Sequence, residues 1–459
     1  MSKKKLENKV VVVTGASSGV GRAIARRFGA EGAKVALIAR DLIGLEDAAS
    51  EIRSTGGQAM VLPLDVSQST AMMAAADRVA FAWGGIDVWV NDAMVSVFAP
   101  VHETTPDEFR RVIEVNYLGY VHGTLAALKH MRPRDAGVIV QIGSAVAYRA
   151  IPLQSAYSAS KAAIRGFTDS LRSELIHARS RIKLTHLQLP AVNTPQFDVV
   201  RSRMPGHPHP VPPVYQPEAI AAVALRAVLR PRREIWIGWP AIKAIIGQRI
   251  VPRFLDGYLA RHAWSSQETR RLPPGHPLKH RDNLDAPVGG DRGARGPFTG
   301  EALPVAGARR LVARGLVAGV AGTLAVALAG WVERRLLGRR PVYAPSRLAR
   351  RLFAQAARTP GRASAIGKAM RWTYGPLVGL VWSATIGRMI RRRWPATRAW
   401  PAGLALGAAV YLFELLALPG SGATRPLARW PAADRLLLAG HTAAFGLAAE
   451  TTRRSLEPS

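Results

Sequence analysis

Seven short apolar runs in the first 240 residues are separated by segments of helix length. The runs are 9–15, 33–40, 58–64, 86–91, 137–143, 182–189 and 234–238. They are continuously apolar rather than alternating, which is typical of strands buried on both faces of a parallel sheet. Strands that alternate with helices indicate βαβ units. The pattern therefore predicts an α/β fold with a doubly wound parallel sheet.

The first run leads into a glycine-rich segment, TGASSGVG, at 14–21. Gly15, Gly19 and Gly21 follow a predicted strand and open a predicted helix. Glycines allow the backbone to approach a pyrophosphate closely, and the free N–H groups of a helix N-terminus attract it. Because glycine turns also open helices that bind nothing, a dinucleotide site here needs support from other motifs.

A tyrosine and a lysine, Tyr157 and Lys161, lie four residues apart in SAYSASKAAIRGF at 155–167. In a helix this spacing places the two side chains one turn apart on the same face. Such pairs also arise by chance. The spacing alone therefore does not separate a catalytic pair from two residues that share a helix face.

Further motifs follow in a fixed order. They are LDV (64–66), NDAM (91–94), VNYLG (115–119) and IGSA (142–145), and Ser144 precedes Tyr157 by 13 residues. Together with the spacing Gly-x-x-x-Gly-x-Gly, these motifs make residues 6–240 resemble the classical short-chain dehydrogenase/reductase family. The resemblance implies a Rossmann-type fold and an oxidoreductase that acts on CH–OH or C=O groups with NAD(P).

The resemblance also implies a role for each of four residues. Tyr157 would be the general acid in carbonyl reduction or the general base in alcohol oxidation. Lys161 would favour the phenolate and so lower the pKa of Tyr157. Ser144 would hold the substrate oxygen near the hydride donor. Asn116 would lie behind the lysine and hold a water for proton exchange.

The family's cofactor contacts carry over to matching positions. At the end of the second predicted strand, the chain has Ala39 and Arg40 where an acidic residue would select NAD(H). A guanidinium suits a 2′-phosphate, so we expect NADP(H), although the neighbouring Asp41 weakens the argument and NAD(H) remains the alternative. The expected cofactor-binding residues are Gly15, Ser17, Ser18, Gly19, Val20, Gly21, Arg40, Asp65, Val66, Asn91, Ala93, Tyr157, Lys161, Pro190, Val192 and Thr194.

Two departures from the family pattern affect this site. The family's Asn-Asn-Ala-Gly reads Asn91, Asp92, Ala93 and Met94. Its Pro-Gly before the substrate loop reads Leu189 and Pro190, followed by Ala191, Val192, Asn193 and Thr194. The segment 195–217 occupies the place of the family's variable substrate lid. Its HPHP sequence is better explained by a proline-stiffened loop than by a metal site, since no cysteine or acidic ligands cluster there.

The remaining chain is strongly basic. Formal net charge is +32, of which residues 1–300 carry +14 (39 Lys and Arg against 25 Asp and Glu) and residues 301–459 carry +18 (24 against 6). Residues 241–262 form a basic amphipathic pattern that suits either a membrane surface or packing on a neighbouring domain. Residues 263–304 are rich in Pro, Gly and charge, which predicts a linker.

Beyond the linker, residues 305–459 contain four apolar windows, at 315–332, 372–387, 399–424 and 436–449. They are short for spanning helices, but tryptophans flank them and small residues suit close packing in lipid. A membrane-embedded helical domain is therefore expected. The 11 basic residues of 334–371 oppose four simple spans, because that connection would face outward, so a soluble helical bundle remains the alternative.

The expected function is NADP(H)-dependent interconversion of a carbonyl and an alcohol on a lipophilic small molecule. The catalytic domain would face the cytosol at the cytoplasmic membrane, in contact with lipid, and the family resemblance suggests a homo-oligomer. A cytoplasmic location is the alternative. A second hypothesis is a membrane protein with a regulatory, cofactor-binding domain of this type. Nucleic acid is not expected as a partner, since the basic residues alternate with apolar helices.

Overall fold

The computed structural model describes residues 4–269, 281–303, 305–338, 359–384, 400–420, 424 and 426–456. The chain divides into two compact units, Met1–Val305 and Ala306–Ser459. Each unit has its own apolar core, and each is described separately below.

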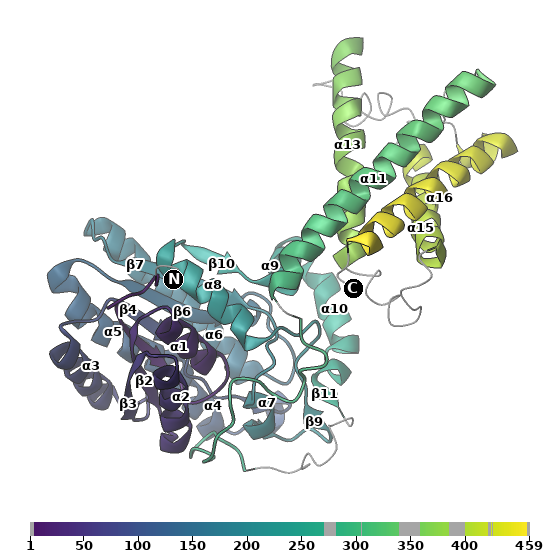
Figure 1. Ribbon diagram of the computed structural model, residues 1–459. Coiled ribbons are helices and arrows are strands. Elements are labelled where there is room, and N and C mark those ends of the chain that lie inside the picture. The colour runs from purple at the N-terminus through teal and green to yellow at the C-terminus, as the bar shows by residue number, and fades with distance from the viewer. Residues whose placement is uncertain are drawn as a thin grey trace. The chain divides into compact units, whose positions relative to one another are not determined.

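The first unit contains the predicted sheet (Figure 1). Its seven strands are all parallel and lie in the order β10-β7-β6-β4-β1-β2-β3. The chain order reverses next to β1, which is the switch point where open α/β sheets bind ligands. The strands are β1 (Val10–Thr14), β2 (Lys34–Ala39), β3 (Gln58–Pro63), β4 (Val88–Asn91), β6 (Val138–Ser144), β7 (Lys183–Leu189) and β10 (Glu234–Trp236). The doubly wound α/β prediction is confirmed.

Helices cover both faces of this sheet, as continuously apolar strands require. One face packs against α1 (Gly19–Ala30), α2 (Leu42–Ser54) and α8 (Pro217–Leu229). The other packs against α3 (Ser69–Trp83), α5 (Gly119–Met131) and α6 (Ser155–His177). Helix α4 (Pro106–Ile113) begins with a capping box between Thr105 and Glu108 and continues through a π-helical turn, Glu114–Leu118, into α5.

Short elements close the carboxyl ends of the strands. Strand β5 (Val97–Phe98) pairs with β8 (Arg201–Ser202), which follows α7 (Gln196–Val199). Strand β9 (His207–Pro208) pairs with β11 (Glu268–Thr269). Between β10 and β11 the chain forms α9 (Gly238–Ile250) and α10 (Pro252–His262), which correspond to the predicted amphipathic segment.

The predicted linker requires a correction. Residues 281–303 pack on the first unit, where Leu284, Ala294 and Phe298 are each 5% exposed or less. The segment has little regular structure. Most of its other contacts are made by backbone carbonyls, glycines and charged side chains, so its sequence shows no apolar periodicity. We call residues 283–298 the strap. Residues 270–280 of the same predicted linker lie outside the described part of the chain.

The second unit is helical, with α11 (Val305–Leu337), α13 (Pro360–Ala384), α15 (Trp400–Gly420) and α16 (Ala432–Ser455). Glycines bring helix backbones together: a Cβ on Gly446 would lie 2.1 Å from the carbonyl oxygen of Gly403, and one on Gly319 2.1 Å from that of Gly375. In the described residues one stretch, Ala313–Leu336, is long and apolar enough to cross a membrane, and Trp400–Leu416 is a shorter apolar helix. Residues 385–387, 399 and 421–423 of the predicted windows lie outside the described residues.

Candidate active site

A cavity of about 610 Å³ opens at the carboxyl ends of β1, β4 and β6. The predicted glycine loop, the turn after β4 and the start of α6 all line it. Most of the predicted site residues lie on its wall: Gly15, Ser17, Ser18, Gly19, Val20, Arg40, Asp65, Val66, Ala93, Ser144, Tyr157, Lys161, Pro190, Val192 and Thr194. Gly21, Asn91 and Asn116 are not on the wall and lie behind it.

Each of the three loop glycines meets a local requirement. Gly15 and Gly19 have φ angles of +72° and +60°, which favour glycine. A Cβ on Gly15 would lie 2.9 Å from the backbone of Ala93, and one on Gly21 2.3 Å from the carbonyl oxygen of Gly15. The loop therefore forms a narrow cradle at the N-terminus of α1, which fits the pyrophosphate of a dinucleotide.

The turn after β4 is fixed from two sides. The hydroxyl of Thr14 accepts hydrogen bonds from the N–H groups of Asp92, at 3.0 Å, and Ala93, at 3.2 Å. The Asn91 side chain is fully buried and bonds to Trp89, Thr124 and Gln141. Asn91 was predicted to bind the cofactor, but it supports the turn from beneath.

Tyr157 and Ser144 lie beside one another at the cavity wall, close enough for the Ser144 hydroxyl to act on the pKa of Tyr157. Ser144 ends β6, and Tyr157 is in the first turn of α6, so the packing of that helix on the sheet brings them together. Burial raises the pKa of Tyr157 to about 12, although the nearby Ser144 hydroxyl lowers it and the charge of Asp92 raises it further. The tyrosine is therefore protonated at neutral pH and able to donate a proton.

Lys161 is 2% exposed, and its ammonium bonds to groups on α5 and β6. It donates to the Tyr120 hydroxyl at 3.0 Å and to the Ile142 carbonyl at 2.8 Å, and it lies 5.6 Å from the centre of the Tyr157 ring. Burial lowers the pKa of Lys161 to about 8, against the opposing effect of Asp92. The predicted lowering of the Tyr157 pKa by Lys161 is not found: burial raises this pKa, and the neighbouring groups that act on it are Ser144 and Asp92.

Tyr120 was not predicted as a site residue. It is 1% exposed, accepts from Lys161, and donates to the Ile142 carbonyl at 2.9 Å. Its pKa is raised well above 10 by burial and by the charge of Asp92, so it stays neutral. The available signal was its position four residues after Asn116, which places both on one helix face.

Asn116 lies in the π-helical turn and is fully buried. Its carboxamide accepts from the Val95 N–H at 2.8 Å and donates to the Val95 carbonyl and to the Ser160 hydroxyl, both at 3.0 Å. Asn116 therefore ties the loop after β4 to helix α6 directly behind Lys161.

Asp92, one of the departures from the family pattern, is a half-buried carboxylate on the cavity wall. Its carboxylate lies against Gly21, where a Cβ would be 2.9 Å from Oδ2, and it attracts the ammonium of Lys161. Burial raises the pKa of Asp92 to about 7. The chain thus has an ionisable group where the family has an amide.

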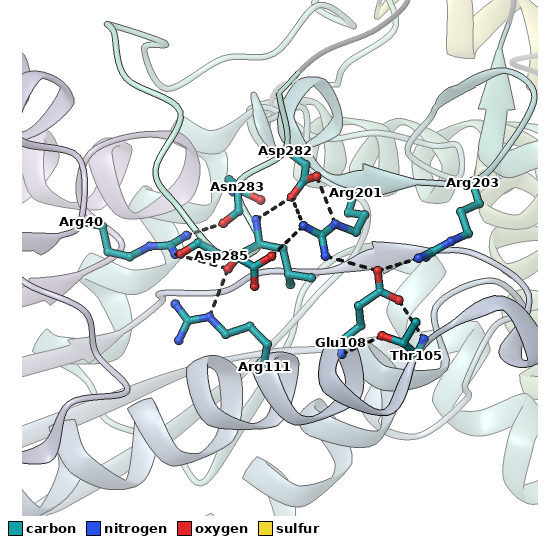
Figure 2. Close-up of polar contacts among 10 residues, drawn as sticks. Arg40, Thr105, Glu108, Arg111, Arg201, Arg203, Asp282, Asn283 and Asp285 are labelled. Carbon is teal, nitrogen blue, oxygen red and sulfur yellow. Dashed lines mark hydrogen bonds and ion pairs between the residues drawn. The ribbon is translucent and has the colours of Figure 1, made fainter.

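At the far end of the cavity, Arg40 and Asp65 are already partnered. Arg40 donates to the carbonyls of Leu284 (3.3 Å), Asp285 (3.0 Å) and Asn283, as Figure 2 shows. Asp65 accepts from Arg111 and from Ser67, and these bonds outweigh desolvation and lower its pKa. Burial lowers the pKa of Arg40. Arg40 keeps its Nε–H for other acceptors, and its guanidinium lines the cavity.

The opposite end of the cavity is apolar and is closed by α9 and α10. Ala241, Ala244, Phe254, Leu255, Tyr258 and Leu259 line it. Arg149, which follows β6, holds both helices through bonds of 2.8 Å to Gln248 and to Asp256. Within the described residues, no group of three His, Asp or Glu side chains is placed to hold a metal ion.

Comparison with known proteins agrees with this geometry. A family model described as short chain dehydrogenase matches residues 9–204. The chain is 32% identical to the Uncharacterized oxidoreductase YxnA of Bacillus subtilis, over 63% of this chain and 82% of that protein. It is 33% identical to a Fatty acyl-CoA reductase of Acinetobacter baylyi, over 50% of this chain and 77% of that protein. A solved metagenomic short-chain oxidoreductase in complex with NADP is 31% identical, with a TM-score of 0.43, over 50% of this chain and 97% of that one. The chain belongs to the short-chain dehydrogenase family of oxidoreductases.

Proposed function

We propose that this oxidoreductase interconverts a carbonyl and an alcohol on a lipophilic substrate with NADP(H), using Tyr157 as its acid and base. The observation that carries the proposal is that Ser144, Tyr157 and Lys161 line one cavity together with a glycine cradle. Two hydroxyl donors side by side suit a carbonyl oxygen on which negative charge develops.

A nicotinamide cofactor bound along the glycine cradle supplies or accepts the hydride. In reduction, Ser144 and Tyr157 both donate hydrogen bonds to the substrate oxygen, and Tyr157 gives its proton as the carbonyl carbon gains the hydride. The product is an alcohol and a phenolate on Tyr157. The nearby ammonium of Lys161 stabilises that phenolate until a proton returns from solvent. Oxidation runs through the same residues in reverse.

Two local features favour NADP(H) over NAD(H). The end of β2 presents Arg40 to the cavity, and β2 itself ends at Ala39 rather than at an acid that would bind a ribose 2′-hydroxyl; Asp41, the next residue, also lines the wall. The neighbouring Asp41, which weakened the sequence argument, caps α2 by accepting the Ile43 N–H at 3.2 Å. Its carboxylate is therefore engaged at the helix start, and Arg40 remains to receive a 2′-phosphate.

The apolar end of the cavity supports a lipophilic substrate. Phe254 and Tyr258 lie at its wall yet are 67% and 49% exposed, so an apolar chain would cover surface that water now contacts. The similarity to a Fatty acyl-CoA reductase supports the same substrate class. The apolar stretch Ala313–Leu336 supports attachment to the cytoplasmic membrane, with the first unit in the cytosol. A homo-oligomer remains a proposal from the family resemblance.

The test is a titration of the full chain with NADPH and, separately, NADH. We expect NADPH to bind more tightly than NADH. Arg40→Ala should raise the Kd for NADPH by about 10-fold or more and change the Kd for NADH little. A series of straight-chain aldehydes should then give rates that rise with chain length. Preference for NADH would overturn the Arg40 assignment alone. Absence of binding to either cofactor by folded protein would overturn the enzyme proposal and favour a regulatory domain.

A further inference from the structure

We propose that the strap, residues 283–298, is the outer wall of the dinucleotide site, and that Arg292 within it binds a phosphate of the cofactor. The inference rests on the proposed function, since it assigns a further binding residue in the same cavity. Asn283, Pro287, Val288, Gly290 and Arg292 line the cavity together with the glycine loop and Arg40.

The strap is fixed at both of its ends by buried apolar side chains. Leu284 is fully buried in the core that covers one face of the sheet, and Phe298 is 5% exposed. The Phe298 N–H also donates to the side chain of Asn193 at 3.0 Å. Between these anchors the chain crosses the cavity. Its position there is consequently set by the fold rather than by chance collapse of a loose segment.

The polar contacts of the strap fall on loops that surround the cofactor cradle. The Gly19 N–H, at the start of α1, donates to the Gly293 carbonyl at 3.1 Å. Arg22, whose side chain is 1% exposed, binds both the Ser17 carbonyl in the cradle and the carboxylate of Asp291. One buried guanidinium therefore couples the position of the strap to that of the cradle.

At its first anchor the strap lies between two arginines. Arg40 and Arg111 both donate to the Leu284 carbonyl, at 3.3 and 3.1 Å. Arg201 holds the side chains of Asp282 and Asp285 nearby and is itself bound to Glu108 (Figure 2). Arg40 is also the residue proposed to bind the 2′-phosphate. One guanidinium would therefore contact both the strap and that phosphate.

Arg292 lies beside this crossing, next to the residue that bonds to the N-terminus of α1. Its Nε–H donates to the Val288 carbonyl at 3.4 Å, and among the described residues it has no acidic partner. A cation beside the positive end of a helix is unfavourable unless an anion lies between them. A cofactor phosphate in the cradle would be that anion, held by the helix N-terminus on one side and by Arg292 on the other.

The glycines of the strap set the path of its backbone past the cavity. Gly290 and Gly293 have φ angles of +114° and +64°, and Cβ atoms built on them would meet open space. Gly296 instead makes a close approach, since its Cβ would lie 2.3 Å from the Thr194 carbonyl oxygen. The backbone between Gly290 and Gly293 therefore follows a path that glycine permits at these two positions, and the bonds of Asp291 and Gly293 hold it there.

The experiment measures NADPH binding to the full chain by fluorescence titration. Arg292→Ala should raise the Kd by about 10- to 100-fold, as expected for loss of a charged hydrogen bond to phosphate, and Arg292→Lys should lose less. The matched control is Arg295→Ala, because Arg295 is in the strap but pairs with Glu218 on the surface at 2.8 Å. Its Kd should change less than 2-fold.

A second readout follows the strap itself in the wild-type chain. Limited trypsin digestion, read by mass spectrometry, should show that NADPH slows cleavage after Arg292 but leaves cleavage after the exposed Arg53 unchanged. An unchanged Kd in Arg292→Ala, or unprotected cleavage at Arg292 in saturating NADPH, would overturn the inference while leaving the proposed function in place. Failure of the wild-type chain to bind either cofactor would overturn the proposed function and this inference with it.

Discussion

The ammonium of Lys161 donates to the hydroxyl of Tyr120 at 3.0 Å, so the lysine is fixed by a residue of α5 as well as by its own helix. The Ile142 carbonyl accepts hydrogen bonds from both side chains. Lys161 is therefore held at a defined place behind Tyr157 by a tyrosine that itself lies outside the proposed proton-transfer path.

Tyr120→Phe tests this positioning role. Loss of an acceptor for the ammonium removes a bond that favours the charged form, so the pKa of Lys161 should fall further below its value of about 8. The basic limb of the kcat/KM–pH profile should move to lower pH, and kcat should fall about 10-fold. An unaltered pH profile would show that Tyr120 serves packing alone.

Tyr157→Phe should remove the proton donor. General acid catalysis contributes about 10²- to 10⁴-fold, so kcat for aldehyde reduction should fall by that factor while the Kd for NADPH changes little. Tyr148→Phe is the matched control, because Tyr148 is a nearby tyrosine whose hydroxyl bonds to Glu234 at 2.7 Å. Full activity in Tyr157→Phe would contradict the assignment.

Asp92→Asn should change the pH dependence of both activity and stability. The charge of Asp92 raises the pKa of Lys161 and of Tyr157, so its removal should shift the basic limb of the activity profile to lower pH. Asp92 itself has its pKa raised from 3.8 to about 7 by burial. The folded state therefore holds a proton that the unfolded state releases, and this contribution to stability is lost as pH rises from about 4 to 7.

Urea unfolding of Asp92→Asn and the wild-type chain should show this directly. The free energy of unfolding of Asp92→Asn, relative to that of the wild-type chain, should increase between pH 4 and 7 and stay constant above pH 7. The increase should reach a few kcal/mol, because one pKa unit is worth about 1.4 kcal/mol. A difference that does not depend on pH would mean that Asp92 is solvated in the folded chain.

The apolar end of the cavity can be tested by filling it. Ala244 lines this end on α9, so Ala244→Phe should raise KM for long-chain aldehydes about 10-fold and leave short ones unaffected. Ala260→Phe adds the same ring on an exposed position of α10. Equal effects of the two variants on all chain lengths would place the substrate elsewhere.

The sequence was sufficient to predict the sheet and the core of the site. Strands such as 9–15 and 137–143 show local apolar runs, and Gly15, Ser144, Tyr157 and Lys161 occur in motifs of fixed spacing. Periodicity and spacing are properties of short stretches, so they can be recognised without tertiary information. The observed strands Val10–Thr14 and Val138–Ser144 agree with the predicted runs to within two residues at each end.

The strap could not be predicted in this way. Its contacts join residues more than 200 positions apart, for example Arg40 and Asp285, and they use backbone carbonyls that carry no sequence signal. Its buried anchors, Leu284, Ala294 and Phe298, are too widely spaced to form a periodic pattern. A composition rich in glycine and proline is typical of a linker, and composition alone does not show that the segment packs on the rest of the unit.

Leu284→Ala tests whether the strap is part of the folded first unit. Leu284 is fully buried, and truncation of a buried leucine costs about 2–5 kcal/mol, so the urea midpoint of the full chain should fall. Hydrogen exchange should rise in residues 283–298, and the Kd for NADPH should increase because the outer wall of the cavity is loosened. Leu42→Ala, at a position 51% exposed on α2, should change the unfolding free energy by about 0.5 kcal/mol or less. If Leu284→Ala unfolds like the wild-type chain and exchanges no faster, the strap does not depend on this anchor for its position.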